Sequence, residues 1–178
     1  MGPANVGMWR QAGLNLNDED NTACSIMHPC IQGKRLYFMA DVPHLLKSVR
    51  NCLENSTIVV PMDVVQANNL PSREIKLQHV SSIVDIQETY ELKLVPGLSR
   101  AYIHPGQYGK MKVGNSTKVF SHTSASVLND LVEEGIISDN ARTTAWFCEL
   151  MNSWFDIMSN RSYPAALFST TNSLDRKS

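Results

Sequence analysis

Apolar residues recur at helical spacing through the C-terminal two-thirds of the chain. The clearest run lies between residues 138 and 160, where Ser138 or Asp139 can cap a helix. One face of that helix would carry residues in an i, i+3, i+4, i+7, i+8, i+11 pattern: Phe147, Leu150, Met151, Trp154, Phe155 and Met158. The same spacing predicts a helix within residues 73–91, and another from about residue 110 to 134 that would bury Phe120 and end at Gly135.

The first third of the chain has a different pattern. Residues 1–33 contain Gly, Asn, Pro and Asp with little periodicity, which predicts that they form no core, and residues 15–21 are predicted to be a polar loop. Residues 35–40 form a short apolar run with two aromatics, which predicts a buried strand that ends at Asp41. From Val42 the apolar spacing becomes helical, and residues 56–61 are either a short strand or an extended linker. We therefore expect a mainly α fold with a small α/β part.

Composition narrows the class of protein. The chain has 178 residues, of which 43% are apolar, and this is enough for one domain or for a small domain plus part of another. Its formal charge is -1, so any contact with nucleic acid must be local. No apolar run has the length of a membrane span, and the N-terminus lacks the order of a signal peptide, so we expect an intracellular protein without a membrane partner.

Cysteine usage gives little evidence for a metal site. The chain has 4 cysteines, which are scattered and suit reduced thiols rather than a disulfide framework. Only Cys24, His28 and Cys30 have a spacing that resembles metal ligation, and no second ligand cluster follows them. We do not favour zinc at this position.

Residue chemistry alone leaves the candidate sites open. The chain contains neither of the common Gly-rich phosphate-binding loops, and residues 106–110 are typical of a turn before a helix. Asp41 stands where polynucleotidyl-transferase folds place a ligand for Mg²⁺, but it can equally cap the helix that follows, and the pattern alone favours the cap. His44, Lys47 and Arg50 recur at every third residue and could contact a phosphate backbone, although a solvated helix face is favoured. Asp156 is either an exposed helix acid or a carboxylate that faces a pocket.

Longer motifs carry a family resemblance. The segment 39–51, in which an Asp precedes Pro-His-x-x-Lys-x-x-Arg-Asn, resembles the second catalytic block of P-element and THAP-domain DNA transposases. Residues 110–113 with 119–122, and also residues 154–158, resemble that family's insertion domain. The order and spacing of the blocks agree with the family over essentially the whole chain.

The resemblance implies two domains and a set of site residues. Residues 1–58 would be a partial RNase H-like strand–helix unit, and residues 59–178 a helical insertion domain that binds GTP as a cofactor for assembly on DNA. Asp41 would be a catalytic acid and a ligand of Mg²⁺ in the parent family. The family's nucleotide contacts correspond to Lys93, Lys112, Val113, Ser121, Phe155 and Asp156. Ser159 stands where the family has Asn, which predicts weaker recognition of the base.

The resemblance also implies partners and a location, namely transposon DNA, a homo-oligomer and the nucleus. The family's other catalytic acids and its zinc-containing DNA-binding module have no counterpart in this sequence. We therefore expect a transposase piece that binds GTP but is not catalytically complete. The alternatives are a partial gene model of an active transposase and a degenerate remnant without nucleotide binding.

Overall fold

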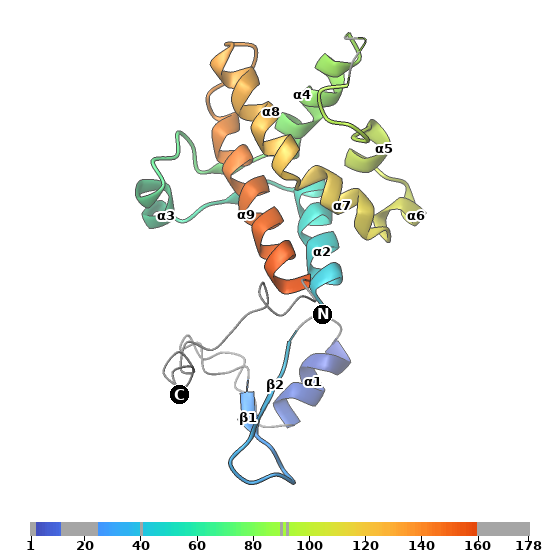
Figure 1. Ribbon diagram of the computed structural model, residues 1–178, viewed down its shortest axis with the longest axis vertical. Coiled ribbons are helices and arrows are strands. Elements are labelled where there is room, and N and C mark those ends of the chain that lie inside the picture. The colour runs from blue at the N-terminus through green and yellow to red at the C-terminus, as the bar shows by residue number, and fades with distance from the viewer. Residues whose placement is uncertain (1–2, 12–24, 40, 90, 92, 160–178) are drawn as a thin grey trace, which may run out of the picture. The chain divides into compact units, whose positions relative to one another are not determined.

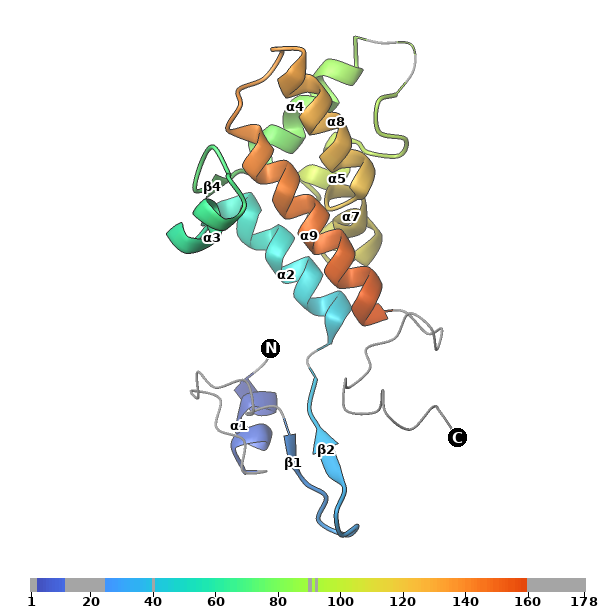
Figure 2. The same ribbon diagram turned by 60° about the vertical axis from the view of Figure 1, so that its left-hand side comes forward.

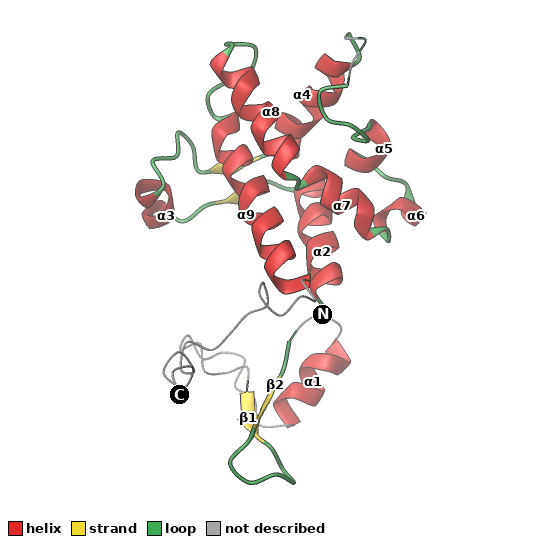
Figure 3. Cartoon of the chain, viewed as in Figure 1, coloured by secondary structure: helices red, strands yellow, loops and turns green. Residues whose placement is uncertain are grey.

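The computed structural model describes residues 3–11, 25–39, 41–89, 91 and 93–159, and all structural statements concern these residues. They are mostly helical, with two small antiparallel sheets (Figure 3). This confirms the predicted mainly α fold. The chain divides into two compact units, Met1–Leu45 and Leu46–Ser178, which are described separately. No helix in the described part is long and apolar enough to cross a membrane.

The N-terminal unit contains a helix and a hairpin. Helix α1 (Pro3–Gln11) precedes strands β1 (Ser25–Met27) and β2 (Arg35–Tyr37), which pair antiparallel with Ile26 opposite Leu36 (Figures 1 and 2). The sequence pattern of residues 1–33 did not indicate these elements, and the predicted polar loop at residues 15–21 lies outside the described residues.

The strand predicted at residues 35–40 exists but is not buried. The side chains of Leu36, Tyr37 and Met39 are 40%, 68% and 62% exposed. A two-stranded hairpin has no second layer to cover its faces, so apolar residues on it stay in contact with solvent. The ring of Phe38 packs edge-on against Trp9, with ring centroids 6.1 Å apart.

His28, which has the spacing of a metal ligand, hydrogen-bonds to the backbone of the hairpin loop instead. His28 Nδ1 accepts hydrogen bonds from the backbone N–H groups of Cys30 and Ile31, both at 3.1 Å. Its ring therefore organises the turn that leads to Gly33, whose φ is +78°. Cys24 lies outside the described residues, and those that are described contain no group of three or more metal-ligating side chains.

The second unit is a bundle of helices with a small two-stranded sheet. The described elements are, in chain order, α2 (Val42–Asn55), β3 (Ile58–Val59), α3 (Met62–Ala67), β4 (Glu74–Ile75), α4 (Leu77–Gln87), α5 (Arg100–Ile103), α6 (Gln107–Lys110), α7 (Val113–Val119), α8 (His122–Glu133) and α9 (Ala141–Ser159). Strands β3 and β4 pair antiparallel, with Ile58 opposite Ile75. Helices α8 and α9 lie side by side in both views (Figures 1 and 2).

Small residues on α9 allow α8 and α9 to pack closely. The buried face of α9 carries Ala141, Thr144, Ala145, Cys148 and Met151. The predicted face is therefore rotated: Leu150 is 47% exposed, while Phe147, Trp154 and Phe155 are only partly buried. Apolar size does not identify the contact face when a close approach of two helices requires small side chains. Burial raises the pKa of the Cys148 thiol to about 12, so this cysteine stays protonated and unreactive.

The helix predicted at residues 110–134 is two helices with a corner between them. Helix α7 ends at Val119, and α8 begins at His122 with Ser121 as its N-cap. The Ser121 hydroxyl oxygen accepts a hydrogen bond from the Ser124 backbone N–H at 3.1 Å. A serine that can cap a new helix competes with continuation of the old one, which the apolar spacing does not reveal. The predicted stop at Gly135 is confirmed, because its φ is +71°.

Candidate functional site

The α6–α7 corner holds the first pair of predicted nucleotide contacts. Lys112 is the N-cap residue of α7 and is exposed, while Val113 is the first residue of that helix and packs against the core. Buried Asn115 fixes the corner by donating a hydrogen bond from Nδ2 to the Gly109 carbonyl at 2.9 Å. A fixed backbone therefore presents the Lys112 ammonium group to solvent.

The α7–α8 corner places Ser121 in a partly buried position. Its hydroxyl lies 3.0 Å from the hydroxyl of Ser124, so the two groups form one small polar cluster at the start of α8. Ser116, on α7, is fully buried, and its Oγ has no hydrogen-bond partner among the described residues. Of the three serines at this corner, Ser116 and Ser124 are buried, whereas Ser121 is only partly buried.

Lys93 lies in the loop between α4 and α5, and it is exposed. Buried Gln87 holds this loop, because its Nε2 donates to the Leu98 carbonyl at 2.9 Å and its Oε1 accepts from the Val95 N–H at 3.2 Å. The loop passes against α7, where a Cβ added to Gly97 would lie 3.5 Å from Cε of Lys118. The structure therefore brings the loop that carries Lys93 to the same helix that Lys112 caps.

The C-terminal end of α9 carries the remaining predicted contacts. Phe155 is partly buried against the core, whereas the next residue, Asp156, is exposed. Asp156 Oδ2 accepts a hydrogen bond from Asn152 Nδ2 at 2.9 Å, one turn earlier on the helix. Ser159 Oγ donates to the Phe155 carbonyl at 2.5 Å, so its hydroxyl is used by its own helix. Asp156 is thus the group at this end that is open to a ligand.

The corner at Ser121 lies beside α9. His122 Nδ1 is 2.7 Å from Glu149 Oε2, and the rings of Phe120 and Phe147 pack edge to face with centroids 5.9 Å apart. Asp156 comes seven residues after Glu149, which corresponds to about 10 Å along a helix. Two cavities of the described structure, about 420 and 550 Å³, are lined by other residues and do not include the predicted contacts.

Comparison with known proteins identifies the family. Residues 43–170 match the family described as TNP-like, GTP-binding insertion domain. The chain belongs to this family. The match begins inside the predicted catalytic part, and the functional division at residue 58 stays a prediction.

Two transposases are similar to this chain. The Transposable element P transposase of Drosophila melanogaster is 26% identical over 161 residues, which is 90% of this chain and 19% of that protein. The DNA transposase THAP9 of Homo sapiens is 26% identical over 161 residues, which is 88% of this chain and 16% of that protein. The chain therefore spans less than a fifth of the length of either relative. These matches confirm the predicted resemblance to P-element-type transposases.

A solved structure has the same fold. The Drosophila P element transposase strand transfer complex matches with a TM-score of 0.75 over 95% of this chain and 36% of that chain, at 23% identity. The likeness supports the arrangement of helices described above.

Asp41, the predicted catalytic residue and metal ligand, lies at the start of α2. Its backbone carbonyl accepts a hydrogen bond from the Leu45 N–H at 3.0 Å, which is the position of an N-cap residue. Its side chain is exposed, and no other two His, Cys, Asp or Glu residues gather around it within the described ranges. These residues alone do not fit a two-metal centre, which needs several carboxylates.

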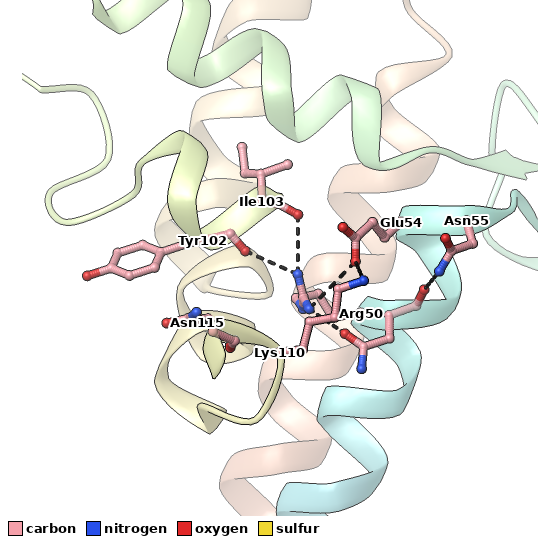
Figure 4. Close-up of polar contacts among 9 residues, drawn as sticks. Arg50, Glu54, Asn55, Tyr102, Ile103, Lys110 and Asn115 are labelled. Carbon is pink, nitrogen blue, oxygen red and sulfur yellow. Dashed lines mark hydrogen bonds and ion pairs between the residues drawn. The ribbon is translucent and has the colours of Figure 1, made fainter. Parts of the chain in front are cut away.

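The second unit also contains a polar cluster that the sequence did not predict. Arg50, which was expected on a polar helix face, is fully buried. Its Nη1 donates to the carbonyls of Tyr102 at 3.4 Å and Ile103 at 3.2 Å, and its Nη2 donates to the side chain of Asn51 (Figure 4). The sequence feature that could have predicted this burial is the position of Arg50 four residues after Leu46, which places it on the apolar face of α2.

Glu54 extends this cluster to α6. Its Oε2 lies 3.2 Å from Lys110 Nζ and 3.9 Å from Arg50 Nη2 (Figure 4). The Glu54 side chain is 15% exposed and the Lys110 side chain 39%. Burial lowers the pKa of Arg50, and the charge of Glu54 opposes that shift. Arg50, Glu54 and Lys110 are called the α2–α6 linkage below.

Proposed function

We propose that the insertion domain of this chain binds GTP, and that in a transposase the bound nucleotide serves assembly on DNA rather than supplying energy. The observation that carries the proposal is the family match over residues 43–170. Further support comes from the exposure of Lys112 and Asp156, a cation and an anion suited to the two ends of the nucleotide. In keeping with the relatives, we propose that the working protein acts in the nucleus on transposon DNA and as a homo-oligomer.

Each predicted contact has a chemical role in this proposal. The ammonium groups of Lys93 and Lys112 would neutralise phosphate oxygens, and the Ser121 hydroxyl would donate a hydrogen bond to one of them. Val113 would offer its backbone, since its side chain packs against the core. Asp156 would accept hydrogen bonds from the ring N–H and the exocyclic amine of guanine, and partly buried Phe155 would hold that carboxylate in place. Adenine offers no such pair of donors.

Guanine preference is the first prediction from this assignment. GTP is expected to bind more tightly than ATP by about 1–3 kcal/mol, or roughly 5- to 150-fold, because adenine would leave the carboxylate of Asp156 desolvated and unpaired. Isothermal titration calorimetry of the full chain with each nucleotide measures the difference. Asp156→Ala is expected to remove the preference, whereas Asp130→Ala, which changes another exposed acid on a helix, should keep it.

Ser159→Asn is the matching gain-of-function variant. Because the Ser159 hydroxyl donates to its own helix, an amide side chain at this position would add a group able to reach the base. We expect it to tighten GTP binding. Equal affinities of the native chain for GTP and ATP would contradict the assignment of Asp156.

A second candidate function is transposase catalysis, in which Asp41 would take part. We propose that Asp41 is a catalytic carboxylate only when other parts of a transposase supply the remaining acids. The present chain with Mg²⁺ or Mn²⁺ is therefore expected to cleave no DNA and to join no strands in a gel-based nicking and strand-transfer assay. Nicking that requires divalent metal and disappears in Asp41→Ala would contradict this prediction.

A further inference from the structure

Arg50 joins α2 to the end of α5. A guanidinium group carries five N–H donors and no acceptor, so burying it requires oxygen partners. Those partners are the carbonyls of Tyr102 and Ile103, at the C-terminal end of a helix that has only four residues, Arg100–Ile103. The last carbonyls of such a helix lack partners within it, and Arg50 satisfies two of them. The position of α5 is thus tied to that of α2.

Glu54, one turn after Arg50 on α2, connects α2 to α6 through an ion pair. Its carboxylate faces Lys110, the last residue of α6, and Lys110 stands two residues before Lys112. The intervening backbone is held at both ends, because the Lys112 N–H donates to the Gly109 carbonyl at 3.1 Å and Asn115 donates to the same oxygen. A displacement of Lys112 is therefore transmitted to Lys110.

A polar linkage of this kind differs from apolar packing because it specifies the relative position of the two segments that it joins. Apolar side chains of suitable volume would stabilise the same contact as well or better, because burying charge has a desolvation cost. Hydrogen bonds to two particular carbonyls have direction, so they favour one register of α2 against α5, and the ion pair of Glu54 adds attraction to Lys110 on α6. A linkage with one preferred register can transmit a change of position between its two ends.

We propose that the α2–α6 linkage couples nucleotide binding at Lys112 and Val113 to the stability of helix α2 over residues 46–55. This inference rests on the proposed function. Neither Glu54 nor Arg50 is among the proposed nucleotide contacts, so their effect on the nucleotide passes through Lys110. Coupling of this kind is reciprocal. If bound nucleotide stabilises α2 by a certain free energy, then a variant that breaks the linkage loses the same free energy of nucleotide binding.

Hydrogen–deuterium exchange of the full chain with and without saturating GTP tests the coupling. GTP is expected to slow exchange of the α2 amides from residue 46 to 55 by about five- to tenfold in the native chain, the lower range of ordinary coupling energies. In Lys110→Met and in Glu54→Gln the slowing should fall below about twofold, while Lys110→Arg should restore it. Arg142→Met is the matched control, because its side chain is 37% exposed and its loss breaks ion pairs with Glu133 and Asp139 at the far end of α9.

Calorimetry on the same samples separates the possible failures. Glu54→Gln is expected to weaken GTP binding by about the same factor as it reduces the protection of α2, which a loss of mere local packing would not produce. GTP binding to the native chain without slower exchange in α2, or equal slowing in the native chain and both variants, would overturn the coupling and leave the proposed function standing. If calorimetry detects no GTP binding to the native chain, the proposed function fails, and the coupling fails with it.

Discussion

Replacing Arg50 with methionine is expected to lower the free energy of unfolding by about 3–5 kcal/mol, the usual effect of removing one partner from a buried charged cluster. Methionine fills much of the space of the arginine stem, so the loss comes mainly from polar groups. The carbonyls of Tyr102 and Ile103 lose their donor, and Glu54 keeps Lys110 alone. Although burial lowers the pKa of Arg50, arginine stays protonated at neutral pH, so its charge is part of the native structure. Urea unfolding followed by circular dichroism measures the change.

A surface arginine provides the control for this measurement. Arg142→Met removes the same charge but breaks ion pairs that are largely exposed, so the free energy of unfolding should change by less than about 1 kcal/mol. Arg50→Lys should recover only part of the loss, because one ammonium group cannot donate to both carbonyls in the planar geometry of a guanidinium group. Equal losses for Arg50→Met and Arg142→Met would show that the buried cluster does not stabilise the fold.

Helical periodicity predicted the longer helices because each buries one face along several turns. Helices α2, α4 and α9 all lie within segments that the apolar spacing marks as helical. The spacing did not predict strand β4 at Glu74–Ile75, since two residues are too few to show a period of two. It also missed α3, which has no buried residue and so has no apolar face to detect. Short elements depend on what they pack against, which a local pattern does not contain.

The burial of a charged side chain was the feature of the candidate site that the sequence predicted least well. Arg50 was assigned to a solvated face because arginine is rarely buried, and only its carbonyl partners, more than fifty residues later in the chain, make its burial possible. The carbonyl partners themselves leave no local trace in the sequence, and only the spacing of Arg50 from Leu46 indicated the apolar face of α2. The exposed position of Asp156 was one of the two predicted alternatives, and its role toward guanine stays a prediction. The same holds for Lys93, Lys112, Val113, Ser121, Phe155 and Ser159, whose positions are now known but whose contacts with a nucleotide are untested.

Phe120→Ala is expected to destabilise the second unit by about 3–5 kcal/mol, the usual cost of truncating a buried phenylalanine. Phe120 is 2% exposed and follows the last residue of α7, so it anchors the corner between α7 and α8 in the core. Its loss removes the edge-to-face contact with Phe147 and leaves a cavity under the corner that carries Ser121. Urea unfolding measures the cost, and hydrogen exchange should show faster opening of residues 113–124 than of the rest of the unit.

Phe147→Ala separates the ring contact from the burial of Phe120. Both variants lose the same aromatic pair, which contributes about 0.5–1.5 kcal/mol beyond area burial. Phe147 is only partly buried, so its truncation leaves a smaller cavity and should cost less than half as much as Phe120→Ala. Equal costs would mean that the two rings are buried to the same degree, and that the corner before Ser121 is held by the ring contact rather than by insertion of Phe120 into the core.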